Sequence, residues 1–502
     1  MPPFRRVLVA NRGEIAVRVI RTLRELGITS IAVFSEPDRA AFHVLQADEA
    51  YPIGPGPASE SYLNAGRVLG VARRARADAV HPGYGFFAEN AAFARACAEA
   101  GMVFIGPRPE TIDALGDKLA ARAIAQRAGV PVIPGSPGPV DSLDDARAVA
   151  RTLGWPLMLK AAAGGGGKGM RVVRNEAELE SAWALTRGEA RAAFGDDRVF
   201  VERAIERPRH VEAQILADAT GRVAFLGERE CSVQRRHQKL LEETPSPAFD
   251  DATRAAFGEA ACRIARAVGY LNAGTVEFIL DERRDFYFLE VNTRLQVEHP
   301  VTEMVTGLDL VAEQVLVAEG APLSFGDATP APRGWAMEAR LIAEDPATGF
   351  LPSIGRISRL RFPHGPGVRT DGGIYRGCDI PVFYDSLLTK LVVHGTDREQ
   401  ARRRLLRALH EFVIEGVHTN LVFHRWLAAH PAFVAGELST RFLEEHFRPE
   451  VLRPSADATE AAVLAAALHA RAERLGVTLP AETSTARSAW RWGARPGEDG
   501  RR

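Results

Sequence analysis

The chain has 502 residues, of which 46% are hydrophobic and 25% are charged, so it has enough apolar material for two to four packed domains. Its 63 basic and 64 acidic side chains give a net charge of -1, which argues against a nucleic-acid partner and a polybasic membrane surface. No apolar run has the length of a membrane span, and four isolated cysteines argue against a disulfide framework. We therefore expect a soluble, cytoplasmic protein.

The N-terminal part alternates short apolar runs with periodic helical stretches, which is typical of an open parallel α/β sheet. A helix and a Pro/Gly-rich hinge follow it. The predicted strands cover residues 6–10, 30–34, 79–81 and 103–105, the predicted helices 14–26, 89–100 and 115–128, and the hinge 130–140.

Beyond the hinge, the pattern predicts a small α+β insert and then a larger core that contains antiparallel strands. The insert is short enough to be a lid. The predicted strands are 157–160, 170–173, 199–202, 211–217, 223–230, 337–343 and 391–393, the predicted hairpin is 274–292, and the predicted helices are 250–268, 311–319, 398–412 and 460–475.

Lysine is rare in this chain, because only five of the 63 basic residues are lysines. Positions that keep the compact ammonium group against such a bias are candidates for a role that needs a point charge, although chance retention is the alternative. We interpret the block around Lys390, YDSLLTKL, as structural. The five lysines are Lys118, Lys160, Lys168, Lys239 and Lys390.

A run of four glycines, residues 164–167, lies between two predicted strands and is flanked by Lys160 and Lys168. Backbone N–H groups of such a run can close over an oligophosphate, and the lysines supply charge for its oxygens. The pattern is not a P-loop, because the GKS/T ending is missing. A flexible linker is the alternative, which the two rare lysines disfavour.

The predicted hairpin places two carboxylates opposite each other. A four-residue loop over residues 282–285 sets Glu277 opposite Glu290, a destabilising arrangement unless a divalent cation lies between them or one is protonated. Asn292 lies on the same face. These residues predict a magnesium site beside the phosphates, with a solvated polar face as the alternative.

If the strand stays extended after Asn292, the period of two also brings Arg294, Gln296 and Glu298 to that face. Such a row could bind a small oxyanion beside the metal, with Glu298 as a base at its end. The segment 230–239 adds a further dense polar cluster.

Seven blocks of the sequence resemble the biotin carboxylase family of ATP-grasp ligases, and together they cover residues 4–447. The resemblance is greatest to the biotin carboxylase component of acyl-CoA carboxylases. The blocks are NRGEIAVRVIR from residue 11, HPGYGFFAEN from 81, KAAAGGGGKGMRVV from 160, PRHVEAQI from 208, ECSVQRRHQKLLEE from 230, FLEVNTRLQVEHPVTE from 288 and AEDP from 343.

The resemblance implies a mixed α/β and α+β fold. An N-terminal open parallel α/β domain would cover residues 1–115, an ATP-grasp domain 116–330 with its lid at about 131–205, and a biotin carboxylase C-terminal domain 331–447. The tail, 448–502, is expected to be partly disordered.

The resemblance also implies the roles of individual residues. The base that deprotonates bicarbonate would be Glu298, with Arg340 stabilising the biotin enolate and Tyr84 near the biotin ring. The bicarbonate site would be Lys239, Arg294, Gln296 and the backbone of Val297; the ATP site Lys118, Lys160, Gly166, Gly167, Glu202, His210, Gln234 and His237; and the metal site Glu277, Glu290 and Asn292.

The implied reaction uses ATP, Mg²⁺ or Mn²⁺ and bicarbonate to carboxylate biotin through carboxyphosphate. No lysine follows Lys390 and none is flanked by methionines, so we expect the biotin on a separate carrier protein. A carboxyltransferase subunit and a homodimer are the other expected partners. The alternatives are a catalytically silent nucleotide-binding scaffold and an ATP-grasp ligase with another acceptor, which the HPGYGF and RLQVEHP blocks disfavour.

Overall fold

The computed structural model describes residues 3–161, 169–453 and 456–474 of the chain. The chain divides into two compact units, residues 1–449 and 450–502. Among the predicted site residues, Gly166 and Gly167 lie outside the described residues, as does Lys168. None of the described helices combines the length and the apolarity needed to cross a membrane.

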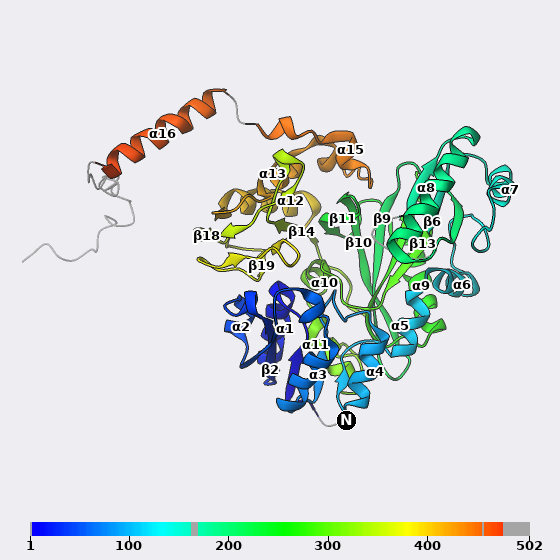
Figure 1. The fold of residues 1–502 in the computed structure, drawn as a ribbon, viewed down its shortest axis with the longest axis horizontal. Coiled ribbons are helices and arrows are strands. Elements are labelled where there is room, and N and C mark those ends of the chain that lie inside the picture. Colours follow the sequence, from blue (N-terminus) through cyan, green and yellow to red (C-terminus); the bar gives the residue numbers. More distant parts are fainter. Residues whose placement is uncertain (1–2, 162–168, 454–455, 475–502) are drawn as a thin grey trace, which may run out of the picture. The chain divides into compact units, whose positions relative to one another are not determined.

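The N-terminal part, coloured blue in Figure 1, contains a five-stranded parallel sheet. Its strand order is β3-β2-β1-β4-β5, which confirms the predicted open α/β sheet. The order changes direction at β1, so the loops after β1 and β4 meet at one edge of the sheet. The elements are β1 Arg6–Val9, α1 Gly13–Glu25, β2 Thr29–Ser35, α2 Phe42–Gln46, β3 Glu49–Gly54, α3 Ala65–Arg74, β4 Ala79–His81, α4 Ala91–Glu99 and β5 Val103–Phe104.

The centre of the first unit is an eight-stranded antiparallel sheet with the order β13-β12-β9-β10-β11-β14-β21-β19. It continues across residue 330, where the sequence predicts a domain boundary. The strands are β9 Arg209–Ala217, β10 Val223–Arg235, β11 Gln238–Thr244, β12 Asn272–Leu280, β13 Phe286–Asn292, β14 Trp335–Ile342, β19 Val368–Gly372 and β21 Leu387–Gly395.

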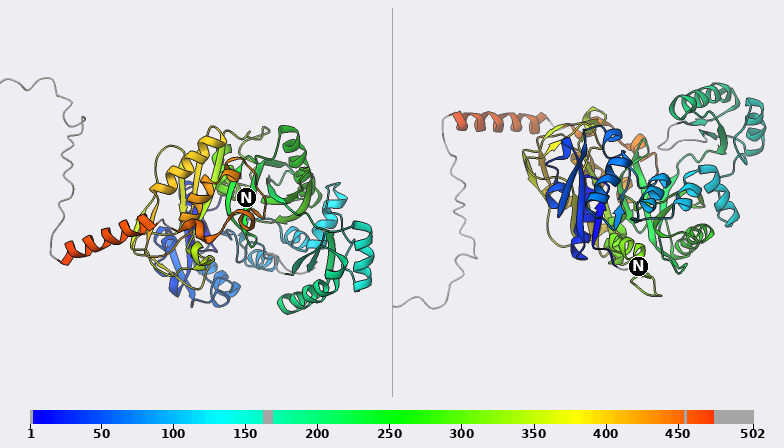
Figure 2. Two further views of the ribbon diagram at one scale, coloured as in Figure 1. Left: turned by 90° about the horizontal axis from the view of Figure 1, so that it is seen from above. Right: turned by 60° about the horizontal axis from the view of Figure 1, so that its bottom comes forward.

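Helices cover this sheet and join it to the N-terminal sheet. Helices α1 and α11 lie side by side (Figures 1 and 2). Their apolar residues share one core with Leu216 and Ala273 of the central sheet and with Val7 of β1. This shared core fixes the two sheets relative to each other, because its side chains are close-packed. The helices after β11 are α9 Asp251–Ala267, α10 His299–Thr306 and α11 Leu310–Ala318.

A small α+β unit occupies the stretch where the sequence predicts a lid. Its three strands pair antiparallel in the order β7-β6-β8, and α7 and α8 pack their apolar residues against them. The elements are α7 Leu143–Leu153, β6 Leu157–Ala161, β7 Met170–Val173, α8 Glu176–Phe194 and β8 Val199–Arg203.

The helix predicted over residues 115–128 is confirmed over residues 118–127, but its predicted start is wrong, because two helices meet there: α5, Pro109–Gly116, and α6, Lys118–Arg127. Asp117 between them has an extended backbone, with φ -85° and ψ 119°, and its side chain accepts a hydrogen bond from the N–H of Ala120. A carboxylate at this position caps the orphan amides of a helix N-terminus. Lys118 is therefore the first residue of α6.

The C-terminal part of the first unit carries helices and short strands against β14 and β21. They are β15 Glu344–Asp345, β16 Leu351–Pro352, β17 Gly355–Arg356, β18 Arg359–Arg361, β20 Asp379–Ile380, α12 Arg398–Glu411, β22 Val413–Glu415, α13 Leu421–Ala429, α14 Pro431–Val434 and α15 Phe442–His446. The described part of the second unit contains α16, Ala456–Arg474, which confirms the helix predicted near the end of the chain.

Candidate active site

The β12–β13 hairpin places Glu277 directly opposite Glu290, as predicted. The predicted loop is wrong, because it spans residues 281–285 instead of 282–285. A bulge at Leu289 adds a residue to β13 and restores the pairing. The longer loop and the bulge shift the register in opposite directions, so Glu277 still faces Glu290.

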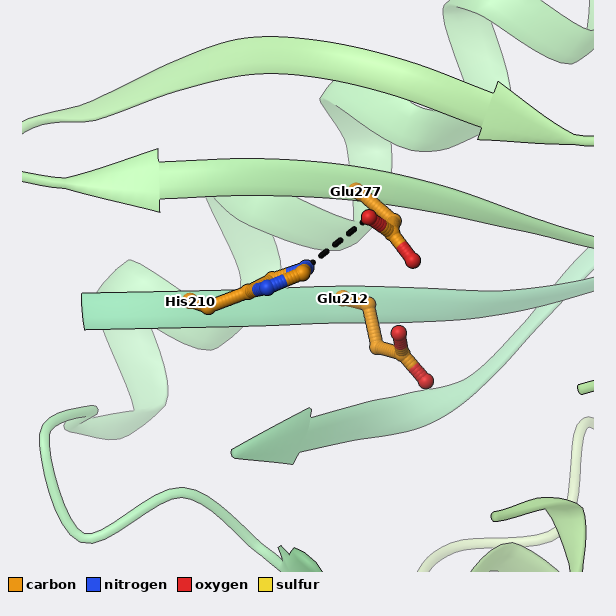
Figure 3. A group of neighbouring side chains, drawn as sticks. All are labelled: His210, Glu212 and Glu277. Atoms are coloured by element: carbon orange, nitrogen blue, oxygen red, sulfur yellow. Dashed lines mark ion pairs between the residues drawn. The ribbon is translucent and has the colours of Figure 1, made fainter. Parts of the chain in front are cut away.

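Both oxygens of the Glu277 carboxylate have partners. Its Oε1 accepts hydrogen bonds from Lys239 Nζ at 2.9 Å, Asn292 Nδ2 at 2.9 Å and Gln296 Nε2 at 3.0 Å. Its Oε2 lies 2.9 Å from His210 Nε2 (Figure 3). Burial opposes ionisation of this carboxyl, but the charges of Lys239 and His210 hold its pKa far below the ordinary value.

The donor set fits a divalent cation. Burial raises the pKa of Glu290, and the negative charge of Glu277 raises it further, so a cation between the two carboxylates would relieve a repulsion that the protein alone leaves in place. Glu277, Glu290 and Asn292 offer carboxylate and amide oxygens, which are the ligands that magnesium prefers. The Asn292 oxygen also accepts a hydrogen bond from Arg294 Nη2 at 3.1 Å, which leaves its second lone pair for a cation.

Lys239 lies at the centre of three carboxylates. Besides Glu277, its Nζ donates to Glu212 Oε2 at 2.5 Å and to Glu298 Oε1 at 2.7 Å. The second oxygen of Glu212 accepts from Arg229 Nε at 2.5 Å, and both side chains are completely buried. The cluster therefore links the hairpin carboxylates to Glu298 through one ammonium group.

Glu298 is completely buried and directly precedes α10. Its Oε2 accepts a hydrogen bond from Arg340 Nη2 at 2.9 Å. Burial favours the protonated form, but the charges of Lys239 and Arg340 hold the pKa of Glu298 well below its ordinary value. The carboxylate is therefore ionised at neutral pH, as a general base must be before it accepts a proton.

The extended row predicted from Asn292 to Glu298 is wrong, because β13 ends at Asn292 and the chain turns before α10. Leu295 is buried in the core that contains α1 and α11, and this burial directs its side chain away from the polar neighbours. Arg294 and Gln296 nevertheless meet, since Arg294 Nη1 donates to Gln296 Oε1 at 3.0 Å. Turns, instead of a period of two, bring these polar side chains together.

A cavity of about 490 Å³ opens beside this cluster. Its walls include Tyr84, Arg294, Val297 and Arg340, all of which the resemblance assigns to the bicarbonate and biotin end of the site. Asn11, in the loop after β1, donates from Nδ2 to the carbonyl of Tyr84 at 2.7 Å. This hydrogen bond joins the loops after β1 and β4 and so fixes the backbone of Tyr84 beside the cavity.

Among the predicted nucleotide residues that the structure describes, two lie on the lid, two on strands of the central sheet, one at the start of α6 and one in a turn: they are Lys160 and Glu202, His210 and Gln234, Lys118, and His237. Lys160 Nζ lies 2.5 Å from Glu202 Oε2, across the pair β6–β8. Gln234 is the register partner of Lys239, and His237 lies in the tight turn between β10 and β11, with φ 67°. The positive charge of Lys118 contributes to the electrostatics at Glu290.

Three family models match the chain in sequence order. Residues 3–112 match the biotin carboxylase N-terminal domain, residues 117–325 the ATP-binding domain of the carbamoyl-phosphate synthase L chain, and residues 338–445 the biotin carboxylase C-terminal domain. Biotin carboxylase 1 of Bacillus subtilis is 51% identical over 444 residues, which are 88% of this chain and 99% of that protein. The chain belongs to the biotin carboxylase family.

Other relatives extend the match. The propionyl-CoA carboxylase alpha chain of Ruegeria pomeroyi is 47% identical over 494 residues, which are 94% of this chain and 72% of that protein. A solved structure, the biotin carboxylase domain dimer of Hydrogenobacter thermophilus 2-oxoglutarate carboxylase with MgADP, ADP and bicarbonate, has a TM-score of 0.86 and 45% identity. The match covers 91% of this chain and all of the chain in the solved structure. The predicted family and fold class are confirmed.

Within this biotin carboxylase, the structure adds charged residues that the sequence reasoning missed; Arg229, Glu242 and Glu338 are buried, Arg122 is half-buried and Glu89 is exposed. Glu212 could have been found, because it follows His210 by two residues and shares its face of β9. The partners of the others come from distant strands and loops, which no local pattern reveals. The added residues are Glu89, Arg122, Arg229, Glu242 and Glu338, of which Glu89 accepts from Arg294 at 2.8 Å and Arg122 donates to Glu202 at 2.7 Å.

Proposed function

We propose that this chain carboxylates biotin with bicarbonate at the expense of ATP, as the biotin carboxylase component of an acyl-CoA carboxylase. The observation that carries the proposal is the convergence on Glu298 of Lys239 and Arg340, beside the hairpin carboxylates. An ionised base flanked by two cations suits the deprotonation of a small anion whose charge those cations also bind.

The bicarbonate end of the site is Lys239, Arg294, Gln296 and the backbone of Val297. Glu298 accepts the bicarbonate proton, and the bicarbonate oxygen attacks the γ-phosphorus of ATP, which releases ADP and forms carboxyphosphate. Approach of bicarbonate to Lys239 and Arg340 weakens their hold on Glu298 and raises its basicity. The carboxylate then takes the proton as the charge on the attacking oxygen develops.

At the nucleotide end of the site, lysine side chains bind the phosphate oxygens of ATP, and the glycine run closes over the phosphates. Magnesium, held by Glu277, Glu290 and Asn292, supplies positive charge to the phosphate oxygens. The lid carries Lys160 and Glu202, and its closure would exclude water that would hydrolyse carboxyphosphate. The residues assigned to ATP are Lys118, Lys160, Gly166, Gly167, Glu202, His210, Gln234 and His237.

Biotin binds at the cavity beside Tyr84. Carboxyphosphate breaks into carbon dioxide and phosphate. The released phosphate takes the ureido proton of biotin, and the biotin nitrogen attacks the carbon dioxide. Arg340 stabilises the enolate oxygen that forms when the proton leaves, because its guanidinium is fixed at the cavity wall.

We propose that the biotin is on a biotin carboxyl carrier protein or domain. Lys390 is completely buried; Lys118, Lys160 and Lys239 are assigned to the nucleotide and bicarbonate sites, and Lys168 lies in the block that starts at residue 160. A carboxyltransferase subunit completes the proposed assembly, and a dimer of this chain is supported by the dimeric relative from Hydrogenobacter thermophilus. The cytoplasmic location stays a prediction.

The test is the ATP-dependent transfer of label from bicarbonate to free biotin by the purified chain with magnesium. Labelled carboxybiotin that requires ATP supports the proposal. Bicarbonate-dependent ATP hydrolysis without labelled biotin would favour an ATP-grasp ligase with another acceptor, and the absence of both reactions would favour a silent nucleotide-binding subunit.

A further inference from the structure

A second pair of carboxyl groups lies behind Arg340. Glu242 on β11 and Glu338 on β14 are register partners in the central sheet, and both side chains are completely buried. Residues directly opposite each other in an antiparallel pair have their β-carbons about 5 Å apart. The two carboxyl groups therefore share one site inside the protein.

The hydrogen bonds of this pair are incomplete. Glu242 Oε1 accepts from Arg340 Nε at 2.6 Å, whereas Glu242 Oε2 and both oxygens of Glu338 have no hydrogen-bond partner among the described residues. A buried carboxylate without partners is costly, because nothing replaces the water that it has lost. A proton on Glu338 removes this cost and gives the free oxygen of Glu242 a donor.

The cations near Glu338 are engaged elsewhere. Lys390 on β21 donates to the carbonyl of Val297 at 2.8 Å and lies 3.2 Å from Glu14 Oε2. Arg340, on the same strand as Glu338, is bound by Glu242 and Glu298. Neither cation is left to neutralise a second carboxylate.

The other surroundings of Glu338 favour its neutral form. Its register partner on β21 is Val392, which packs with Ala336 and Val301 in an apolar cluster. The charged groups that act on Glu338 are Lys390, Glu242, Arg340 and Glu298. Burial raises the pKa of Glu338 well above the ordinary value; Lys390 opposes this rise and Glu242 adds to it.

We propose that Glu242 and Glu338 share one proton at neutral pH, and that Glu338 is thereby a positioning residue for Arg340. The O–H of Glu338 donates to Glu242 Oε2, which leaves Glu242 Oε1 to hold the guanidinium toward Glu298 and the cavity. The part about Arg340 rests on the proposed function, whereas the shared proton does not.

The shared proton is tested by comparing two carboxyl-to-amide variants. Glu338→Gln keeps a donor and removes no charge, so its thermal midpoint should equal or exceed that of the wild type. The matched control is Glu243→Gln, because Glu243 is equally buried but accepts from Arg398 Nε at 2.8 Å and Nη2 at 2.9 Å. This control should lower the midpoint, since it leaves a guanidinium without its counter-charge.

Infrared spectroscopy at neutral pH detects the protonated carboxyl group directly. The C=O stretch of protonated carboxyl groups should have the same intensity in the wild type and in Glu243→Gln, and should lose the contribution of one group in Glu338→Gln. Glu14, whose pKa is raised to about 7, contributes equally in all three proteins. An unchanged stretch in Glu338→Gln, or a midpoint that falls as far as in Glu243→Gln, would overturn the shared proton.

The positioning role is tested with free biotin as the probe. Glu338→Met, which removes the donor, should lower kcat for biotin carboxylation about tenfold or more, as misplaced catalytic groups do, while biotin-independent ATP hydrolysis changes less. Glu338→Gln should keep most of the wild-type kcat, because its amide still donates a hydrogen bond. An unchanged kcat in Glu338→Met would overturn the role. A wild type that fails to carboxylate biotin would instead contradict the proposed function and leave the infrared and melting results interpretable.

Discussion

Lys390 is completely buried, and its Nζ donates a 2.8 Å hydrogen bond to the carbonyl oxygen of Val297. The bond ties strand β21 to the segment between β13 and α10, whose backbone the proposed bicarbonate site uses. The sequence block around Lys390 is interpreted as structural, and the structural contact that Lys390 makes lies next to the proposed bicarbonate site.

Replacing Lys390 with methionine should leave the Val297 carbonyl and Glu14 without their cation. We expect the free energy of unfolding to fall by about 3 kcal/mol, as for other broken buried pairs, and KM for bicarbonate to rise. Urea unfolding and steady-state kinetics check the two effects. The control is Arg403→Met, whose side chain is 70% exposed and should change stability by about 0.5 kcal/mol or less. Equal effects of the two variants would contradict this account of Lys390.

Glu298→Gln should abolish bicarbonate-dependent ATP hydrolysis, because the amide cannot accept the bicarbonate proton. Nucleotide binding should be largely kept, since no nucleotide role is assigned to Glu298. Phosphate release and nucleotide titration by calorimetry measure the two properties. Unchanged turnover would rule out Glu298 as the base.

Glu290→Gln should stabilise the metal-free protein, because it removes the repulsion between Glu290 and the opposed Glu277. It should also reduce the rise in thermal midpoint that magnesium and ADP produce together. Melting curves with and without magnesium measure both effects. If the variant kept the full magnesium-dependent rise, Glu290 would not be a ligand.

Glu14 gives a pH dependence of stability. Burial raises its pKa from 4.5 to about 7, although Lys390 opposes the rise. Between these values the folded chain holds a proton that the unfolded chain has released, so the free energy of unfolding falls as pH rises through this window.

Glu14→Gln should match the wild type below this window and be more stable above it, by up to about 3 kcal/mol for a rise of this size. Urea unfolding across the pH range measures the difference. Parallel pH profiles of the two proteins would show that Glu14 has no raised pKa.

The sequence predicted the elements well where local patterns decide them, such as β1, α1 and the β12–β13 hairpin. The facing of Glu277 and Glu290 was correct although the loop length was not, because the bulge at Leu289 compensates for it. Bulges and loop ends depend on packing, so a residue count cannot place them.

The buried charges were harder to predict. Glu242 and Glu338 come from strands β11 and β14, which are far apart in the sequence and meet only because β14 joins the edge of β11. The blocks that resemble biotin carboxylases identified residues for the proposed ATP, metal and bicarbonate sites. The pairing of strands supplies the residues behind them, and it became visible only in the fold.

The rate of ATP hydrolysis by the purified chain, with magnesium and bicarbonate and with or without free biotin, decides whether the chain is an active biotin carboxylase. We expect hydrolysis that requires bicarbonate and is stimulated by biotin, because carboxyphosphate forms beside Glu298 and biotin accepts its carbon dioxide. Hydrolysis that is indifferent to biotin, or no hydrolysis at all, would contradict it.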